Sequence, residues 1–387
     1  MASTLAIGAQ QPGIFDNVIA LEGQRQAAAE VGDHAKALAF STQLMAELAS
    51  LPDSIVDNMD QMWANQYYDL ACHQSRCGLV DEALLSLYNA ACKGWNNYDH
   101  LLVDHDLDNL RDSPRFAGIA LKVRNRDFKY ILSNCPDYND AIPENCPDRI
   151  FADPTDPHLQ QLRTRLNLDS IAGDGDEISR IQRITTFVHN YIHHNGMKGI
   201  PCDRNSLAMI DSCANGRNTL NCRGMAIFLN ECLLSMGIPS MYVTCMPKVL
   251  LSDCHVINAV WSSQLGRWLW MDPSFNAWIS DEQGNLLGIR EVRQRLRQGL
   301  PLVLNPEASH YDDGPTEKSW YLDYYMTKNL YAIEANVRNV YGAENSETRS
   351  NGTVQFIALI PPTADIPDYA RESIITTNDA WFWQAPL

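Results

Sequence analysis

A cysteine, a histidine and an aspartate occur in an order that suits thiol chemistry on amide bonds. Cys222 follows the polar loop 215–218 and opens a helical pattern, so the free N–H groups and dipole of a helix N-terminus favour its thiolate. His255 begins a predicted strand, and Asp272 ends the next one. Adjacent antiparallel strands joined by a short turn bring these two side chains together. A thiolate, an imidazole and an orienting carboxylate are the parts of a nucleophilic acyl-transfer site.

The elements around these residues predict an α+β domain in which a helix packs on an antiparallel sheet. The helical pattern after Cys222 stops at Gly237-Ile238-Pro239. Alternating or β-branched runs then predict strands over residues 241–245, 256–261 and 268–271, with a hairpin turn over residues 262–266.

The runs around the three residues resemble the motifs of the transglutaminase-like superfamily, which has a papain-like fold. The resemblance covers about residues 178–305 and implies that Cys222 is the nucleophile, His255 the general base and acid, and Asp272 the orienting carboxylate. The matching runs are Asn221-Cys222-Arg223-Gly224-Met225-Ala226, Gly237-Ile238-Pro239-Ser240-Met241-Tyr242-Val243, Asp253-Cys254-His255-Val256 and Trp270-Met271-Asp272-Pro273-Ser274.

The same resemblance implies an oxyanion hole formed by the backbone N–H of the cysteine and an upstream side chain. Asn218, Asn215 and His194 are the candidates for that side chain. Arg223 is expected to add positive charge near the thiol. His189 and His193 have the spacing of two zinc ligands, but the Glu that would follow the first His is absent, so neither a metal nor a cofactor is expected.

The implied reaction forms a thioester on Cys222, which either water or an amine resolves. Hydrolysis by a protease, amidase or deamidase is favoured, because many bacterial members of the superfamily resemble such enzymes and no acceptor-amine site is readable. A protein-glutamine transglutaminase is the alternative reaction. A non-catalytic protein-binding module is the alternative of another class. The expected partner is a peptide or protein substrate, guided by the helical region.

The helical region covers residues 1–134 and resembles a tetratricopeptide domain. Its pattern of small and aromatic residues is typical of a helix-turn-helix in which two antiparallel helices approach closely. A plain helical bundle without a binding role stays an open alternative. The residues that carry the pattern are Tyr67, Leu70, Ala71, Gly78, Ala83, Leu87 and Ala90.

The remaining chain divides into a Pro- and Asp-rich linker over residues 135–157, a catalytic core over 158–305 and a β-rich C-terminal extension over 306–387 that packs on the core. Helices are predicted near residues 158–166 and over 178–194, and strands over 329–335 and 354–360. The polar stretch 342–352 is expected to be a mobile loop.

Composition excludes some partners. The 387-residue chain has a formal net charge of -17, which disfavours nucleic acid and anionic membranes as partners. No apolar run approaches the roughly 20 residues that a membrane span needs. The N-terminal residues lack the basic and apolar regions of a signal peptide, so a cytoplasmic location is expected, or an extracytoplasmic one if a signal peptide has been removed.

Overall fold

The structure is a computed structural model that describes residues 13, 15–52, 55, 59–141, 147–249, 254–310, 314–362, 370 and 372–386. The chain divides into two compact units, Met1–Ile131 and Leu132–Leu387. Each unit has hydrophobic clusters of its own. The predicted catalytic residues all belong to the second unit.

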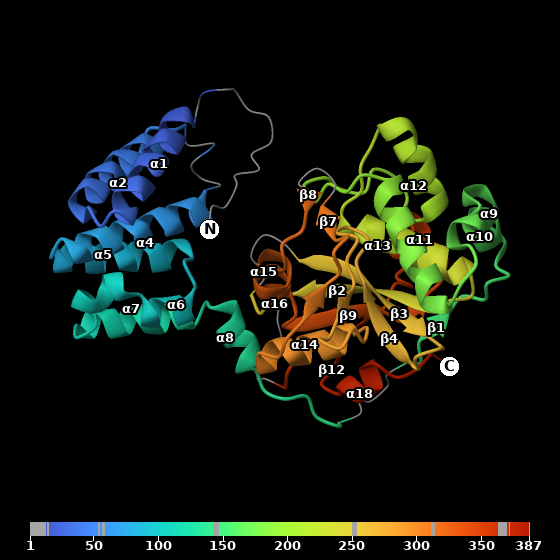
Figure 1. The fold of residues 1–387 in the computed structure, drawn as a ribbon. Coiled ribbons are helices and arrows are strands. Elements are labelled where there is room, and N and C mark those ends of the chain that lie inside the picture. Colours follow the sequence, from blue (N-terminus) through green and yellow to red (C-terminus); the bar gives the residue numbers. More distant parts are fainter. Residues whose placement is uncertain are drawn as a thin grey trace. The chain divides into compact units, whose positions relative to one another are not determined.

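The described part of the first unit is helical (Figure 1). Helices α1 and α2 form one hairpin and α4 and α5 another, and each hairpin turns at a glycine with positive φ, Gly32 at 75° and Gly78 at 76°. Its elements are α1 (Asp16–Glu30), α2 (His34–Ala49), α4 (Asp60–Arg76), α5 (Val80–Lys93), α6 (Tyr98–Val103), the 3-10 helix η1 (His105–Leu110) and α7 (Pro114–Arg124), and α8 (Phe128–Ser133) begins in it.

The α4–α5 hairpin has the close packing that its small residues predict. Ala71, Ala83 and Ala90 are fully buried in one cluster with Leu87. Only glycine adopts the left-handed conformation at position 78 without strain, so the turn stays short. The predicted helix-turn-helix is therefore confirmed, whereas its assignment to the tetratricopeptide class stays a prediction.

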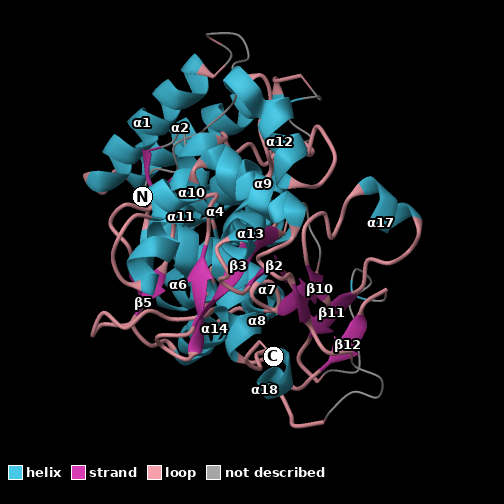
Figure 2. Ribbon diagram, turned by 90° about the vertical axis from the view of Figure 1, so that its right-hand side faces the viewer, coloured by secondary structure: helices cyan, strands magenta, loops and turns pink. Residues whose placement is uncertain are grey.

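The second unit is built on a six-stranded sheet with the strand order β12-β11-β9-β2-β3-β4. Neighbouring strands are antiparallel except β11 and β12, which are parallel. The strands from the end of the chain lie on the opposite side of β2 from β3 (Figure 2). The strands are β2 (Ser240–Met246), β3 (His255–Ser262), β4 (Arg267–Met271), β9 (Ala332–Asn336), β11 (Phe356–Leu359) and β12 (Ile374–Thr376).

Shorter elements surround this sheet. The two-residue strands form the pairs β1–β10, β5–β6 and β7–β8. They are β1 (Ile150–Phe151), β5 (Ile279–Ser280), β6 (Val303–Leu304), β7 (Ser309–His310), β8 (Gly314–Pro315) and β10 (Arg338–Asn339). The helices are α9 (Pro157–Leu166), α10 (Leu168–Ala172), α11 (Glu177–Tyr191), α12 (Ser206–Cys213), η2 (Ala214–Gly216), α13 (Cys222–Ser235), α14 (Ile289–Gln298), α15 (Lys318–Trp320), the π-helix η3 (Tyr321–Met326), α16 (Thr327–Asn329), α17 (Ser346–Ser350) and α18 (Asp379–Phe382).

Helices cover both faces of the sheet. Met241 and Val243 of β2 point into the cluster that contains residues of α14 and α18, whereas Tyr242 points into the cluster that contains α9, α11 and α13. Figure 1 shows these two groups of helices on opposite sides of the strands. This alternation is what a strand buried on both faces requires. Strands β2, β3 and β4 and helix α13 occur where the sequence predicts them.

Helix α13, which begins at the predicted nucleophile, is the central helix of the unit. Every residue from Gly224 to Ser235 is buried. Asn258 of β3 donates from Nδ2 to the backbone oxygen of Ala226 at 3.0 Å and ties the helix to the sheet. A helix that is buried all round has little freedom to shift, so its N-terminus is a rigid platform.

Two predicted elements differ from the structure. The helix expected over residues 178–194 ends at Tyr191, because Ile192 is already extended, and His194 instead forms a bridge with Leu220. The stretch 342–352, expected to be a mobile loop, contains α17 and the buried carboxylate of Glu344. The local sequence does not predict either feature, because each depends on contacts with segments that are distant in the chain.

The central position of α13 gives a prediction for stability. Phe228 lies in its middle and is fully buried. Replacement Phe228→Ala should lower the free energy of unfolding by about 3–5 kcal/mol through lost burial and a cavity. Leu265→Ala in the exposed β3–β4 turn is the control, with an expected change within about 0.5 kcal/mol. Denaturant unfolding measures both, and equal effects would contradict the central role of the helix.

Candidate active site

Cys222 occupies the first position of α13. Asn221 caps the helix, because its side-chain oxygen accepts a hydrogen bond from the backbone N–H of Gly224 at 3.0 Å. A Cβ atom at position 224 would lie 3.1 Å from Leu220 and 3.3 Å from Ile200, so glycine lets the helix begin in this tight space. The run Asn-Cys-Arg-Gly thus starts a helix at the thiol and directs the free N–H groups of its first turn toward the sulfur.

His255 and Asp272 meet as the strand order predicts. His255 is the first residue of β3, Asp272 directly follows β4, and His255 Nε2 donates to Asp272 Oδ2 at 2.6 Å. Both side chains are buried. Asp272 also accepts hydrogen bonds from the Tyr321 hydroxyl at 2.6 Å and from the Ser274 backbone N–H at 2.8 Å. Burial alone would raise the pKa of the Asp272 carboxyl, but His255 and these donors hold it below its ordinary value.

The thiol and the imidazole form a coupled pair. Burial opposes ionisation of Cys222, yet hydrogen bonds from His194 and His255, the His255 charge and the Val256 backbone N–H lower the pKa of the thiol to about 6. Burial likewise opposes the charge on His255, but Asp272 and Cys222 raise its pKa to about 10. At neutral pH the pair is therefore a thiolate and an imidazolium, the reactive state of a cysteine nucleophile.

A second imidazole faces the thiol. Backbone hydrogen bonds from Asn195 to Leu220 at 2.7 Å and from Leu220 to His193 at 3.0 Å pin the chain at His194 beside the start of α13. His194 contributes a side-chain hydrogen bond that lowers the pKa of Cys222, although its buried Nε2 has no partner of regular hydrogen-bond geometry among the described residues. Its Nδ1 lies 2.9 Å from Nε2 of His310.

The two asparagines proposed for the oxyanion hole lie on the surface. Asn218 is exposed, and its Nδ2 donates to the backbone oxygen and the hydroxyl of Ser212, both at 3.0 Å. Asn215 is exposed in the left-handed conformation, with φ at 62°. Of the three candidates, the structure brings only His194 into contact with Cys222. The oxyanion role itself stays a prediction.

Aromatic residues adjoin the imidazole of His255. The rings of Phe275 and Tyr325 lie 5.5 and 5.3 Å from the ring of His255. Trp320 stacks on Tyr325 at 5.1 Å with an interplanar angle of 7°, and it is 46% exposed. An indole that is stacked on one ring and open to solvent offers an apolar surface next to the site.

Sequence reasoning missed the contribution of the C-terminal segment to this site. Tyr321, which binds Asp272, and His310, which binds His194, both follow residue 305, where the catalytic core was expected to end. The available signal is the aromatic run Trp320-Tyr321-Leu322-Asp323-Tyr324-Tyr325. Trp268 and Trp270 of β4 do not contribute to an exposed aromatic surface, because both are buried in the core.

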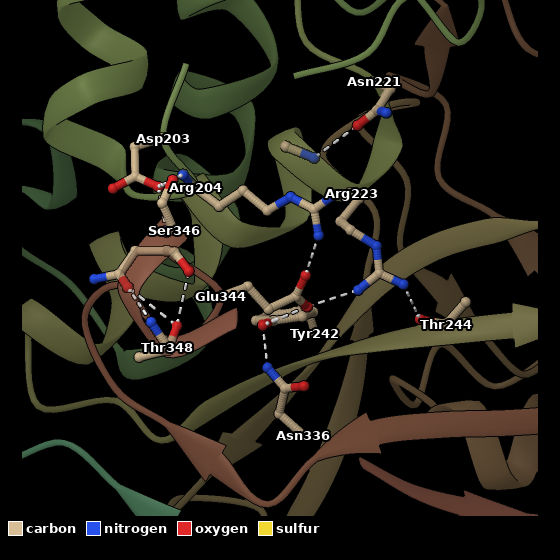
Figure 3. A network of polar contacts seen from close by, with 12 residues as sticks. Asp203, Arg204, Asn221, Arg223, Tyr242, Thr244, Asn336, Glu344, Ser346 and Thr348 are labelled. Carbon is tan, nitrogen blue, oxygen red and sulfur yellow. Dashed lines mark hydrogen bonds and ion pairs between the residues drawn. The ribbon is translucent and has the colours of Figure 1, made fainter. Parts of the chain in front are cut away.

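A polar network holds the start of α13 against the sheet and the C-terminal segment (Figure 3). The buried Glu344 carboxylate accepts hydrogen bonds from Arg204 at 2.6 Å, Arg223 at 2.7 Å and the Tyr242 hydroxyl at 2.8 Å. Arg223 also donates to the Thr244 hydroxyl at 2.9 Å. The positive charge expected to stabilise the thiolate is therefore balanced by Glu344 instead, and the two histidines take that role.

Within the described residues, the structure contains neither a cluster of metal-binding side chains nor a helix that could span a membrane. No group of three or more His, Cys, Asp or Glu side chains in this part of the chain is arranged to hold a metal ion. Among the described helices, none combines the length and the apolar character that crossing a bilayer needs.

The lowered pKa of Cys222 predicts selective alkylation. At pH 7 about nine-tenths of a thiol with a pKa near 6 is thiolate, so iodoacetamide should modify Cys222 rapidly. Cys202 is the internal control, because it is also half-buried but burial raises the pKa of its thiol. Peptide mass mapping over a pH series should give a midpoint near 6 for Cys222. A midpoint near its ordinary value of 9 would contradict the ion pair.

The Glu344 network predicts a pH-dependent contribution to stability. Glu344→Gln removes the carboxylate that two arginines share, so we expect the free energy of unfolding at pH 7 to fall by about 3 kcal/mol. Burial raises the pKa of Glu344, but Arg223, Tyr242 and Arg204 lower it below its ordinary 4.5. The contribution is therefore present above about pH 4.5 and is lost as the pH falls further.

Urea unfolding of the wild type and the Gln variant at pH 7 and at pH 3.5 tests this expectation. The difference between the two proteins should shrink at the lower pH. Glu347→Gln is the matched control, because Glu347 is an exposed carboxylate of the same segment. A difference that stays constant with pH would show that the ionised carboxylate is not what stabilises the network.

Comparisons with known proteins give little beyond this geometry. No protein-family model and no curated protein sequence matches the chain. Among solved structures, that of a putative cysteine protease from Cytophaga hutchinsonii is similar at 15% sequence identity and a TM-score of 0.25. The match covers 49% of this chain and 60% of that one, so the chain spans less than two thirds of that protein. A likeness this slight carries no argument, and function is argued from the site alone.

Proposed function

We propose that the second unit is a cysteine hydrolase that cleaves amide or peptide bonds through a thioester on Cys222. The observation that carries the proposal is the series Cys222–His255–Asp272, in which the buried aspartate is hydrogen-bonded to the imidazole and the imidazole to the thiol. A thiol with a pKa near 6 at a helix N-terminus has little structural purpose, because burying a charge costs free energy. The motif resemblance to the transglutaminase-like superfamily supports the same reaction class.

The first half of the reaction follows from the protonation states. The Cys222 thiolate attacks the carbonyl carbon and forms an S–C bond, while the carbonyl electron pair moves to the oxygen. Collapse of this tetrahedral intermediate breaks the C–N bond. The His255 imidazolium, which binds Asp272 through Nε2, delivers a proton from Nδ1 to the departing nitrogen. Asp272 keeps the ring oriented and stabilises its charge throughout.

Water completes the cycle. Neutral His255 takes a proton from a water molecule, whose oxygen attacks the thioester carbonyl. The S–C bond then breaks, and the acid product leaves as the thiolate and imidazolium are restored. A primary amine in place of water would give a transamidated product through the same intermediate, so the thioester is common to both reactions.

Two N–H groups near the thiol support a proposed oxyanion hole. The backbone N–H of Cys222 belongs to the open first turn of α13. Nε2 of His194 is buried close to the thiol without a partner of regular geometry among the described residues. An oxygen that arrives with a substrate would satisfy both donors, which is the arrangement that stabilises a tetrahedral intermediate. These observations support His194, rather than Asn218 or Asn215, as the side chain of the proposed oxyanion hole.

A peptide library with mass-spectrometric readout tests the proposal and identifies the bond that is cleaved. We expect cleavage or deamidation by the wild type, and a loss of at least about 1,000-fold in kcat/KM for Cys222→Ala. The pH profile of kcat/KM should be bell-shaped. It rises as Cys222 loses its proton near pH 6 and falls as His255 loses its proton near pH 10.

The matched control is Cys202→Ala, which removes a half-buried thiol of raised pKa and should leave the rate unchanged. A labelled primary amine added to the reaction distinguishes the two fates of the thioester, because its incorporation into product would favour transamidation. Activity that survives in Cys222→Ala would refute the nucleophile. A folded wild type that reacts with no peptide would favour a binding protein in which the three residues no longer turn over substrate.

A further inference from the structure

The contact between His194 and His310 has a definite proton arrangement. Two imidazole nitrogens 2.9 Å apart, His194 Nδ1 and His310 Nε2, form a hydrogen bond only if one of them carries the proton. If His310 donates, neutral His194 must hold its own proton on Nε2, the other ring nitrogen. If His194 donates from Nδ1, its Nε2 is left as an acceptor.

The Cys222 thiolate, which faces the other side of His194, decides between these two proton positions. His194 lowers the pKa of Cys222, and because its Nδ1 faces His310, the ring nitrogen left for the thiol is the buried Nε2, which has no other partner among the described residues. A thiolate accepts hydrogen bonds, so Nε2 must carry an N–H. A proton on every nitrogen of the contact would place two donors face to face. The arrangement that satisfies both ends with neutral rings is therefore His310 N–H donating to His194, and His194 N–H donating toward Cys222.

The fold fixes both rings. His194 is held by the backbone bridge to Leu220. His310 ends β7, whose Ser309 N–H donates to the backbone oxygen of Phe275 at 2.9 Å, and the His310 ring packs on Phe275 at 5.1 Å. The same phenyl ring contacts His194 and His255. Strand β7 is thus attached to the candidate site through Phe275, whose ring contacts all three imidazoles.

We propose that His310 is a positioning residue that holds His194 in the tautomer with its proton on Nε2, so that this N–H faces the thiolate and then the oxyanion. The oxyanion part rests on the proposed function, whereas the thiolate part does not. Two hydrogen-bonded pairs then face the sulfur of Cys222, and we call them the two arms of the site. In the first arm, Asp272–His255, the imidazole moves the proton. In the second arm, His310–His194, the imidazole supplies a fixed hydrogen-bond donor. A histidine-to-histidine bond performs in the second arm the orienting task that a carboxylate performs in the first.

Other titratable groups near the second arm do not replace His310. His189 lies within electrostatic range of His194, His310 and Asp272, but its Nδ1 faces the backbone oxygen of Pro273 at 3.0 Å. Burial lowers the pKa of His189, which keeps it neutral near pH 7. The charge of Arg223 on α13 does not replace His310 either, because Arg223 is paired with Glu344.

Three substitutions at position 310 test the proposal in the full-length protein. His310→Ala removes the donor. His310→Phe removes it while keeping a ring that packs on Phe275. His310→Gln keeps a side-chain N–H that reaches His194 Nδ1. His158→Ala, which deletes an exposed imidazole of α9, is the control for loss of a histidine.

The first readout is the pH midpoint for alkylation of Cys222 by iodoacetamide, which requires no substrate. We expect an upward shift from about 6 for the Ala and Phe variants, and the wild-type midpoint for Gln and for His158→Ala. The second readout is turnover of a cleaved peptide. We expect kcat to fall by up to about 100-fold for Ala and Phe with little change in KM, the lower range for loss of an oxyanion donor, and to recover in Gln.

A wild-type midpoint and kcat in His310→Phe would overturn the proposal. So would a Gln variant as impaired as Phe, because that result would assign the effect to shape rather than to the hydrogen bond. The two hypotheses fail separately. If no peptide is ever cleaved, the proposed function fails, but the alkylation midpoint still decides whether His310 controls the donor that faces the thiol.

Discussion

The site depends on one buried charge, the carboxylate of Asp272. A carboxylate enclosed in protein is costly unless its oxygens are hydrogen-bonded, and here His255, Tyr321 and the Ser274 N–H surround it. Because this charge persists, His255 keeps its proton, and because His255 is positive, Cys222 loses its own. The reactivity of a thiol on one element is therefore set by donors to an oxygen on another. Any change that lets Asp272 become neutral would therefore remove the part of the thiolate's stabilisation that His255 provides.

Residues far along the chain complete the hydrogen bonds and the charge balance of the site. Tyr321 binds the carboxylate, His310 binds the second imidazole, and Glu344 neutralises the arginine next to the nucleophile. Strand β9, which follows Tyr321, lies between β2 and β11 in the central sheet. The C-terminal segment is thus part of the same folded unit as Cys222, His255 and Asp272, and it contributes both to the central sheet and to the candidate site.

The buried position of α13 explains why the Cys222 thiol is held rigidly in place. The helix is buried all round, capped by Asn221 and tied to the sheet by Asn258. Its N-terminus cannot move without disturbing the hydrophobic cluster between α13 and the sheet, which also contains residues of α9 and α11. The stability of the unit and the placement of the thiol are consequently one property, because the same packing provides both.

The sequence by itself predicted the candidate residues Cys222, His255 and Asp272 and determined the local elements that carry them. Cys222 at a helix start, His255 at a strand start and Asp272 at a strand end are local patterns, since caps, turns and alternation depend on neighbours in the chain. Only the tertiary structure decided which partners complete them. It replaced Arg223 with His194 beside the thiol and brought His310 and Tyr321 to the site. Such contacts join residues separated by many positions, and no local pattern encodes which distant side chain a fold will place within hydrogen-bond reach.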